Sequence, residues 1–422
     1  MPVFIASWRM GRERSFLHAV YESRPAIMPR TYLYNNCTNN IVLKAYRFRL
    51  YPTKSQITTM ERTLDLCRWT YNQTLSYRKN AWEKEGRSIS KYEMHNFLPR
   101  WKEEYPELNE VFSQTLQSVQ ERVDLAFKAF FRRVKAGEKP GYPRFRGRGW
   151  YDSFTYPQMG FKINTGKLYL SKIGDIKIKL HRSIEGKIKR LTVRRSATGK
   201  WFACFSVETE DAALPPWKDG SVVGIDVGLD SFATLSNGEK IANPRFFREE
   251  EHELARVQRR LSRASKGTLE RRSALKIVHR VHERIANKRY EFAHQVSHSL
   301  VDRFGLIALE DLNIKCMVHN HNLARSISDV AWNMLVTITS YKAASAGSVV
   351  VLVDPRNTSK MCSRCGILAE KSISDRVHNC PKCGLSMDRD WNAAINILRL
   401  GLQSVGEASR KSSVLLGGEW SP

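Results

Sequence analysis

The pattern of apolar and polar residues in the first third of the chain predicts one strand followed by helices. Residues 43–51 alternate in the manner of a strand, and Pro52 ends the run. Two helices should follow, because apolar side chains recur there at spacings of three and four. The apolar faces consist of Met60, Leu64, Cys67, Tyr71 and Leu75 in the first helix and Leu116, Val119, Val123, Phe127, Phe130 and Val134 in the second.

Between residues 167 and 208 the pattern changes to short runs with a period of two. In 176–180 and 190–194 apolar residues alternate with lysine, arginine or threonine, and residues 197–199 fit a hairpin turn. Such alternation buries one face of a sheet and leaves a basic face in solvent. A small barrel that binds a nucleic-acid backbone fits this pattern. A plain β-domain with a solvated basic face fits it nearly as well.

Beyond Pro215 and Pro216, which mark a boundary, apolar strand-like runs alternate with helical ones. This alternation predicts an α/β sheet packed on both faces. The strand-like runs cover 221–230, 304–312 and 348–354, and the helical runs cover 254–289, 323–347 and a stretch that begins near Asp390.

Charge narrows the class of partner. Lys and Arg number 69 against 42 Asp and Glu, a net charge of +27, and so basic a chain is expected to bind a polyanion such as nucleic acid. An anionic membrane surface is the alternative. No charge-free apolar run is long enough for a spanning helix, and the apolar start lacks the basic region of a secretory signal. We therefore expect a cytoplasmic protein without a membrane partner.

Two segments concentrate this positive charge. Residues 131–151 interleave aromatic with basic side chains, which offer stacking faces and phosphate contacts. Between Arg256 and Arg289 there are 12 Lys or Arg and only two acids. Each segment is either a solvated basic surface or, as we prefer, a contact to a phosphate backbone.

Four of the eight cysteines stand at metal-binding spacing. Cys362 and Cys365 form one C-x-x-C pair, Cys380 and Cys383 form another, and 14 residues separate the pairs. Each pair offers two thiolates to one ion, so we expect one structural Zn²⁺ in a closed shell. A redox dithiol is the alternative, and two matched pairs argue against it. The scattered remaining cysteines suit a reducing compartment.

Three acids are candidates for a catalytic site. Asp226 interrupts an apolar strand run, Glu310 ends another, and Asp390 opens the last helix. Individually each has a structural explanation, as a buried acid, a strand-end cap or a helix cap, and Asp388 is a second candidate for the helix cap. Together, hard oxygen ligands of this kind bind Mg²⁺, and two such ions can clamp a phosphodiester. A basic protein with this trio is expected to hydrolyse nucleic acid.

These motifs resemble a known family. GIDVG at 224–228, ALEDL at 308–312 and DRDWNAAINI at 388–397, with the zinc ribbon before the last, are similar to the split RuvC-type nuclease of TnpB proteins. These are transposon-encoded, RNA-guided relatives of the type V CRISPR effectors. The resemblance covers about Val42 to Leu400. It also includes KAYRFRLYPTKSQ at 44–56, AFFRRVKAGEKPGYPRFR at 129–146, NPRFF at 243–247, RIANKR at 284–289 and SISDVAWNML at 326–335.

The resemblance implies a multidomain α/β fold. It combines an RNase H-like (RuvC) nuclease and its inserted zinc ribbon with a helical recognition lobe and a β-barrel wedge domain. The N-terminal extension is the main departure from the family pattern. The implied segments are the extension (1–41), the wedge in two parts (42–54 and 137–217), the recognition domain (55–136), the nuclease in two parts (218–357 and 386–402), the ribbon (358–385) and a flexible tail (403–422).

The resemblance also implies roles for residues. Asp226, Glu310 and Asp390 would be the catalytic Mg²⁺ ligands, with Asp388 a structural acid. In the stretch 111–120, Gln117 would read a short target-adjacent DNA motif with Thr155 behind it, since an amide can pair with adenine. An exposed helix glutamine without that role is equally compatible.

The implied partners are a guide RNA from the transposon end, double-stranded target DNA and a transposase encoded nearby. The implied activity is RNA-guided, metal-dependent DNA cleavage, with sequence read by base pairing. The alternatives are a non-enzymatic RNA-guided DNA-binding regulator and a transposase or its accessory. The intact trio of Asp226, Glu310 and Asp390 favours the nuclease over the regulator.

Overall fold

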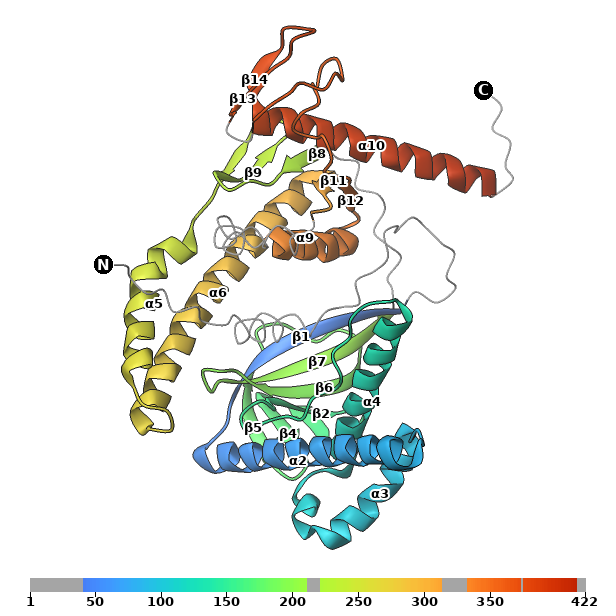
Figure 1. Ribbon diagram of the computed structural model, residues 1–422, viewed down its shortest axis with the longest axis vertical. Helices are drawn as coiled ribbons and strands as arrows, with labels where there is room; N and C mark the ends of the chain where they lie inside the picture. Colours follow the sequence, from blue (N-terminus) through green and yellow to red (C-terminus); the bar gives the residue numbers. More distant parts are fainter. Residues whose placement is uncertain (1–40, 211–220, 313–331, 373–374, 416–422) are drawn as a thin grey trace. The chain divides into compact units, whose positions relative to one another are not determined.

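The computed structural model describes residues 41–210, 221–312, 332–372 and 375–415 (Figure 1). Residues 1–40 of the predicted N-terminal extension (1–41) and the first part of the helix expected over 323–347 lie outside these ranges. None of the described helices is long and apolar enough to cross a membrane.

A barrel-like antiparallel sheet is formed from the first half of the described chain. Its strand order is β2-β6-β7-β1-β5-β4-β3, so the N-terminal β1 lies in the middle, between β7 and β5. The period-two runs are confirmed as strands, and β6 pairs with β7 across the predicted hairpin turn. The bounds are β1 Ile41–Tyr51, β2 Ser153–Tyr156, β3 Phe161–Asn164, β4 Lys167–Leu170, β5 Gly174–Lys179, β6 Lys187–Arg195 and β7 Trp201–Glu210.

Helices share one core with this sheet. Phe48 and Phe205 from the strands and Met60 and Leu116 from the helices are all buried in it. The first helix begins at a capping box in which Thr53 and Gln56 exchange backbone hydrogen bonds. The elements are α2 Lys54–Glu85, α3 Lys91–Glu104, a 3₁₀ turn at Pro106–Glu110 and α4 Ser113–Lys135.

A second sheet follows, with strand order β10-β9-β8-β11-β12. Its strands β8, β11 and β12 run parallel, while β9 and β10 are antiparallel additions at one edge. The strand bounds are β8 Ser221–Asp226, β9 Ser231–Leu235, β10 Lys240–Ala242, β11 Phe304–Glu310 and β12 Val349–Val353. The helices of this part are α5 Phe246–Arg263, α6 Leu269–Arg303, α9 Trp332–Ala346 and α10 Arg389–Leu415.

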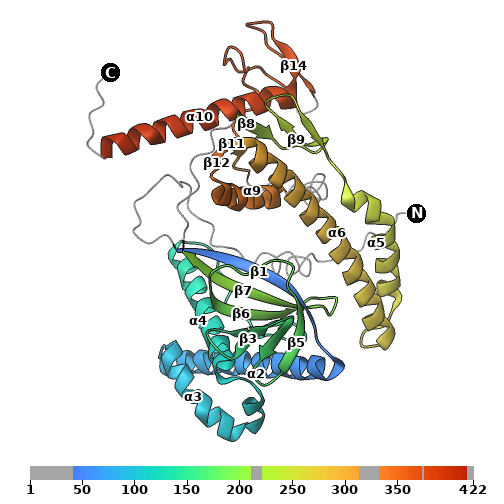
Figure 2. The ribbon, with the colours of Figure 1, turned by 180° about the vertical axis from the view of Figure 1, so that it is seen from behind.

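Helices cover both faces of this sheet, as the sequence predicted. Val223 and Ile225 of β8 pack in one core with the C-terminal part of α6 and with α9. The intervening Gly224 faces α10 on the other side, where an added Cβ would lie 2.2 Å from the Ala394 carbonyl oxygen. Both ribbon views show α10 and α9 on opposite sides of the strands (Figures 1 and 2).

The segment between β12 and α10 forms a small ribbon. Its strands β13 (Val377–Asn379) and β14 (Ser386–Asp388) are antiparallel. The last residue of β14 directly precedes the first residue of α10. Helix α10 then continues to Leu415, where the sequence had predicted a flexible tail from residue 403. Residues 403–415 are mostly polar but include no proline that would end the helix.

Candidate metal centres

Two of the three predicted carboxylates stand at the carboxyl ends of neighbouring parallel strands. Asp226 is the last residue of β8 and Glu310 is the last residue of β11. The register pairs Ile225 with Leu309, the residues immediately before them. Parallel strands in register therefore bring these two side chains to one edge of the sheet.

The third carboxylate reaches the same edge from α10. Asp390 lies in the first turn of that helix, and a Cβ added at Gly228, just after β8, would lie 4.0 Å from its Oδ2 atom. Burial raises the pKa of Asp226 well above its usual range, and the charges of Glu310 and Asp390 raise it further. The structure thus brings the three predicted residues together, while their catalytic role stays a prediction.

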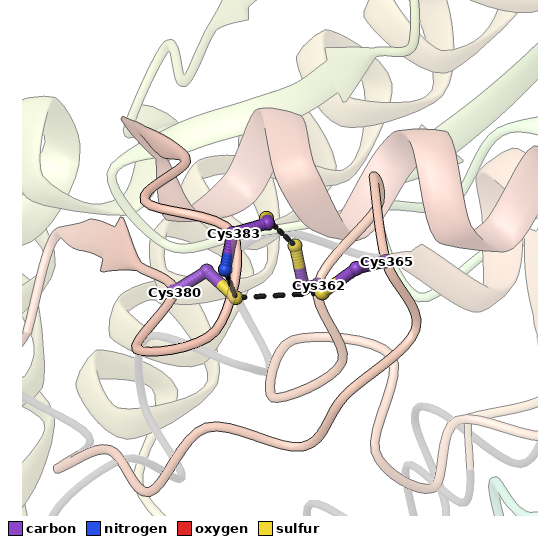
Figure 3. Close-up of side chains that lie close together, drawn as sticks. All are labelled: Cys362, Cys365, Cys380 and Cys383. Atoms are coloured by element: carbon purple, nitrogen blue, oxygen red, sulfur yellow. Dashed lines mark hydrogen bonds between the residues drawn. The ribbon is translucent and has the colours of Figure 1, made fainter.

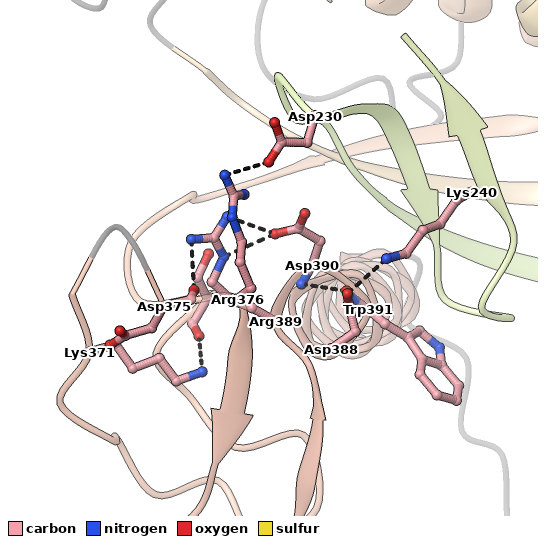
Figure 4. A network of polar contacts seen from close by, with 10 residues as sticks. Asp230, Lys240, Lys371, Asp375, Arg376, Asp388, Arg389, Asp390 and Trp391 are labelled. Atoms are coloured by element: carbon pink, nitrogen blue, oxygen red, sulfur yellow. Dashed lines mark hydrogen bonds and ion pairs between the residues drawn. The ribbon is translucent and has the colours of Figure 1, made fainter.

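This carboxylate edge carries more negative than positive charge. Burial also raises the pKa of Glu310, and a hydrogen bond from Thr358 partly offsets the effect. The nearby cation is Arg389, whose Nε and Nη2 atoms each lie 3.0 Å from Asp390 Oδ1 (Figure 4). Three carboxylate side chains gathered at one edge suit a hard divalent cation. The carboxylate oxygens are nevertheless not as tightly gathered as the cysteine sulfurs within the described residues.

Asp388 makes a different set of contacts from Asp390. Its Oδ1 accepts hydrogen bonds of 3.0 Å from the backbone N–H groups of Asp390 and Trp391, and its Oδ2 lies 2.7 Å from Lys240 Nζ (Figure 4). Trp391 in turn donates to the Ser236 carbonyl at 2.9 Å. Asp388 therefore caps α10 and ties its start to the β9–β10 hairpin. This geometry supports its interpretation as a structural acid.

The four cysteines of the two C-x-x-C pairs come together in the ribbon (Figure 3). Their sulfur atoms all lie within 4.8 Å of one another, with 3.6 Å between Cys362 and Cys383 and 3.5 Å between Cys365 and Cys380. A disulfide would require about 2.05 Å, whereas a tetrahedral zinc with bonds of about 2.3 Å separates its sulfurs by about 3.8 Å. The cluster fits a four-thiolate zinc site.

The backbone geometry around the cysteines also fits metal binding. Gly366 and Gly384 follow the second cysteine of each pair and adopt φ values of 76° and 69°, which glycine tolerates without strain. The Cys383 N–H donates to Cys380 Sγ, and this is the largest of several hydrogen bonds that together lower the pKa of the Cys380 thiol to about 6. A thiol that ionises readily is ready to bind a metal.

Several residues join the ribbon to the carboxylate edge, and sequence reasoning missed them. Asn392 and Asn396 of α10 are fully buried and bind the chain just before Cys362, and Thr358 donates to Glu310. The two asparagines are four residues apart and therefore share one helix face, a pattern that was visible in the sequence. Thr358 carried no signal in the sequence.

The two predicted DNA-motif readers differ in exposure. Gln117 lies on the exposed side of α4. Thr155 is only 4% exposed, and its hydroxyl is bonded to Arg122 Nη2 at 2.8 Å and Thr192 Oγ1 at 3.0 Å. In this arrangement Thr155 orients Arg122 and does not present its hydroxyl to a base. Thr155 is buried together with its neighbours Phe154 and Tyr156. Its part in motif reading stays a prediction.

The aromatic-basic stretch at 131–151 has the exposure that nucleic-acid contact requires. Phe131, Tyr142, Phe145 and Trp150 each expose 42% or more of their surface. On the sheet, the Arg47 guanidinium lies 3.9 Å from the centre of the Phe202 ring. Such rings and cations are available for stacking and for phosphate contacts.

Three family models match consecutive parts of the chain. A model described as "Helix-turn-helix domain" matches residues 40–87, and one described as "Probable transposase" matches 204–321. A third, described as "Cas12f1-like, TNB domain", matches residues 332–397, which include the four cysteines.

Curated proteins match over most of the chain. One from Streptomyces pristinaespiralis, named "Putative RNA-guided DNA endonuclease", is 37% identical over 86% of this chain and 90% of its own length. Another from Escherichia coli K12, named "Putative RNA-guided DNA endonuclease InsQ", is 31% identical over 85% of this chain and 92% of its own. A TnpB-like protein of Acanthamoeba polyphaga mimivirus is 32% identical over 30% of this chain and 25% of its own.

A solved structure shares the fold. The protein in a cryo-EM structure of a Cas12f1–sgRNA–target DNA complex superposes with a TM-score of 0.50 at 16% identity, covering 81% of this chain and 82% of that one. The family models, the relatives and the fold agree with the motifs found in the sequence. At 37% identity across 86% of its length, the chain belongs to the TnpB family.

Proposed function

We propose that this protein is an RNA-guided DNA endonuclease that cleaves its target by metal-dependent phosphodiester hydrolysis. The observation that carries the proposal is the meeting of Asp226, Glu310 and Asp390 at one edge of the β8–β11–β12 sheet. The names of the relatives in the TnpB family point to the same activity. The sheet and α10 would then be a RuvC-like nuclease formed from 218–357 and 386–402, with the ribbon at 358–385 inserted between its parts.

The three carboxylates would hold a pair of Mg²⁺ ions. The metal would supply Lewis-acid activation of water and stabilisation of the leaving oxygen. Asp226 and Glu310 contribute oxygens from strand ends, where the sheet fixes their backbones. Arg389 would orient Asp390 through its two contacts to the Oδ1 oxygen. The ribbon would hold one structural Zn²⁺ and would take no part in the reaction.

The basic and aromatic surfaces would bind nucleic acid. Contacts to phosphates and exposed rings suit a guide RNA and its heteroduplex with DNA, because base pairing supplies the sequence. Gln117, exposed on α4, is our candidate for reading a target-adjacent motif.

The test is cleavage that depends on RNA. The protein is purified with RNA expressed from the DNA that flanks its gene, and the copurified RNA is sequenced to give the guide. A plasmid library with the matching target and randomised adjacent bases is then incubated with the complex and Mg²⁺. Cleavage should require the RNA and should vanish in Asp226→Ala.

Each alternative predicts another result. Cleavage that persists after the RNA has been removed and degraded would refute guidance. Binding to the matched target without cleavage would indicate a regulator, and strand joining instead of hydrolysis would indicate a transposase.

A further inference from the structure

A buried hydrogen bond links Glu310 to the loop that leads into the ribbon. Thr358 is 2% exposed, and its Oγ1 lies 2.6 Å from Glu310 Oε1. The Pro355 carbonyl lies 3.1 Å from the same hydroxyl and is the alternative acceptor. A hydroxyl has one proton to donate, and the shorter contact to an acid is the stronger one.

Thr358 is itself fixed from α10. Asn396 Nδ2 donates to the Thr358 carbonyl at 2.9 Å and to the Met361 carbonyl at 2.6 Å. Asn392 Nδ2 also donates to Met361, at 2.7 Å, and Asn392 Oδ1 accepts from the Ser363 N–H at 2.9 Å. Both asparagine side chains are fully buried. The helix that carries Asp390 therefore holds the backbone on both sides of Cys362.

The effect on Glu310 follows from its freedom to rotate. A glutamate side chain has three torsions, and even a buried one keeps several rotamers unless something binds its carboxylate. Thr358 binds one oxygen and leaves the other for a ligand. Such outer contacts typically set the orientation of a metal-binding carboxylate, and their loss weakens metal affinity or activity by about 10- to 100-fold.

We propose that Thr358 is a positioning residue that fixes the Glu310 carboxylate for a divalent cation, and that Asn396 holds Thr358 in place. This inference rests on the proposed function, because it takes Glu310 as a metal ligand. It also gives the ribbon a defined connection to the site. The loop from Thr358 to Cys362 joins Glu310 at one end and the first cysteine at the other.

The test compares Thr358→Val, which keeps the shape and loses the hydroxyl, with Thr358→Ser, which keeps the hydroxyl. Thr70→Val is the matched control, since Thr70 is also buried and donates at 3.0 Å to a backbone carbonyl, that of Leu66 in α2. Mn²⁺ binding to zinc-loaded, RNA-free protein is measured by electron paramagnetic resonance, and Glu310→Gln identifies the signal of this site. Cleavage by the guided complex is measured against Mg²⁺ concentration.

Thr358→Val should weaken Mn²⁺ binding by about 10-fold or more and should raise the Mg²⁺ concentration needed for cleavage by a similar factor. Thr358→Ser and Thr70→Val should stay within about threefold of the parent in both measurements. Unchanged Mn²⁺ affinity in Thr358→Val would overturn the inference, as would a serine variant as weak as the valine variant. A parent protein without any Glu310-dependent Mn²⁺ signal would overturn it too.

The two readouts separate this inference from the proposed function. If the parent cleaves a guided target and Thr358→Val behaves like the parent, the positioning role fails and the nuclease stands. If the parent binds Mn²⁺ with the expected dependence on Thr358 and cleaves nothing, the positioning role stands and the nuclease fails.

Discussion

Replacing Gly224 with alanine should separate the carboxylates without altering any of them. Gly224 lies two residues before Asp226, on the face of β8 that α10 covers. A Cβ at this position would lie 2.2 Å from the Ala394 carbonyl oxygen and 2.5 Å from the Leu398 nitrogen. Both are backbone atoms, so no side chain can rotate away to make room. The strand and the helix must move apart.

The size of that movement sets the expected effect. Ordinary contacts of a Cβ begin at 3.4 Å, so α10 would have to retreat by about 1 Å. Misplacing a reacting group by 1 Å can lower a rate by about 100-fold. Overpacking of this kind also costs about 1–3 kcal/mol of folding stability. We expect Gly224→Ala to cleave about 100 times more slowly and to melt at a lower temperature.

The assay is single-turnover cleavage by the assembled RNA complex, with RNA binding and thermal unfolding measured in parallel. Gly401→Ala tests the same packing from the helix, since its Cβ would lie 2.6 Å from Ala308 Cβ. Gly406→Ala is the control, because nothing lies within 4 Å of a Cβ there. This control should stabilise α10 by up to about 1 kcal/mol and leave cleavage unchanged. Parent-like cleavage in Gly224→Ala, with RNA binding intact, would refute the reasoning.

Three further changes have expected outcomes. Asp226→Asn should abolish cleavage and yet stabilise the metal-free protein by roughly 1–3 kcal/mol, because it removes a buried charge that two neighbours repel. The raised pKa makes ionised Asp226 costly at neutral pH, so the gain in melting temperature should shrink as pH falls toward about 4. A gain that is absent at neutral pH would contradict this. Combined Cys362→Ser and Cys380→Ser substitutions should remove one bound zinc, as measured by elemental analysis, and should impair cleavage more than RNA binding. A parent protein without zinc would refute the zinc site. Gln117→Ala should change which adjacent bases permit cleavage in the plasmid library, with rates on the best sequence within about tenfold of the parent. An unchanged base preference would exclude Gln117 as a reader.

Local patterns in the sequence predicted the elements well. The strand–helix alternation after Pro216 became a sheet covered on both faces, and the cysteine spacing became a compact sulfur cluster. Both succeed because the signal is short-range: periodicity reports which side chains are buried, and two C-x-x-C turns are nearly complete metal half-sites.

Contacts between distant segments could not be predicted in this way. The approach of α10 to Gly224 depends on which faces meet, and a glycine within a strand has several explanations. The hydrogen bonds of Thr155 to Arg122 and Thr192 join segments far apart in the chain, so no local pattern around Thr155 could indicate them. The choice between Asp388 and Asp390 rests on family resemblance, and the sequence alone could not show the hydrogen bonds by which Asp388 caps α10.

The late position of α10 in the chain has a consequence for synthesis on the ribosome. The barrel-like sheet and the basic helices are complete by residue 303, whereas Asp390 and the helix that seats it follow after the ribbon. A nascent chain therefore has its proposed RNA-binding surfaces long before its third carboxylate has been made. With Asp390 as the third metal ligand, as proposed, this order of segments would keep the growing chain from acting as a nuclease until it can already bind a guide RNA.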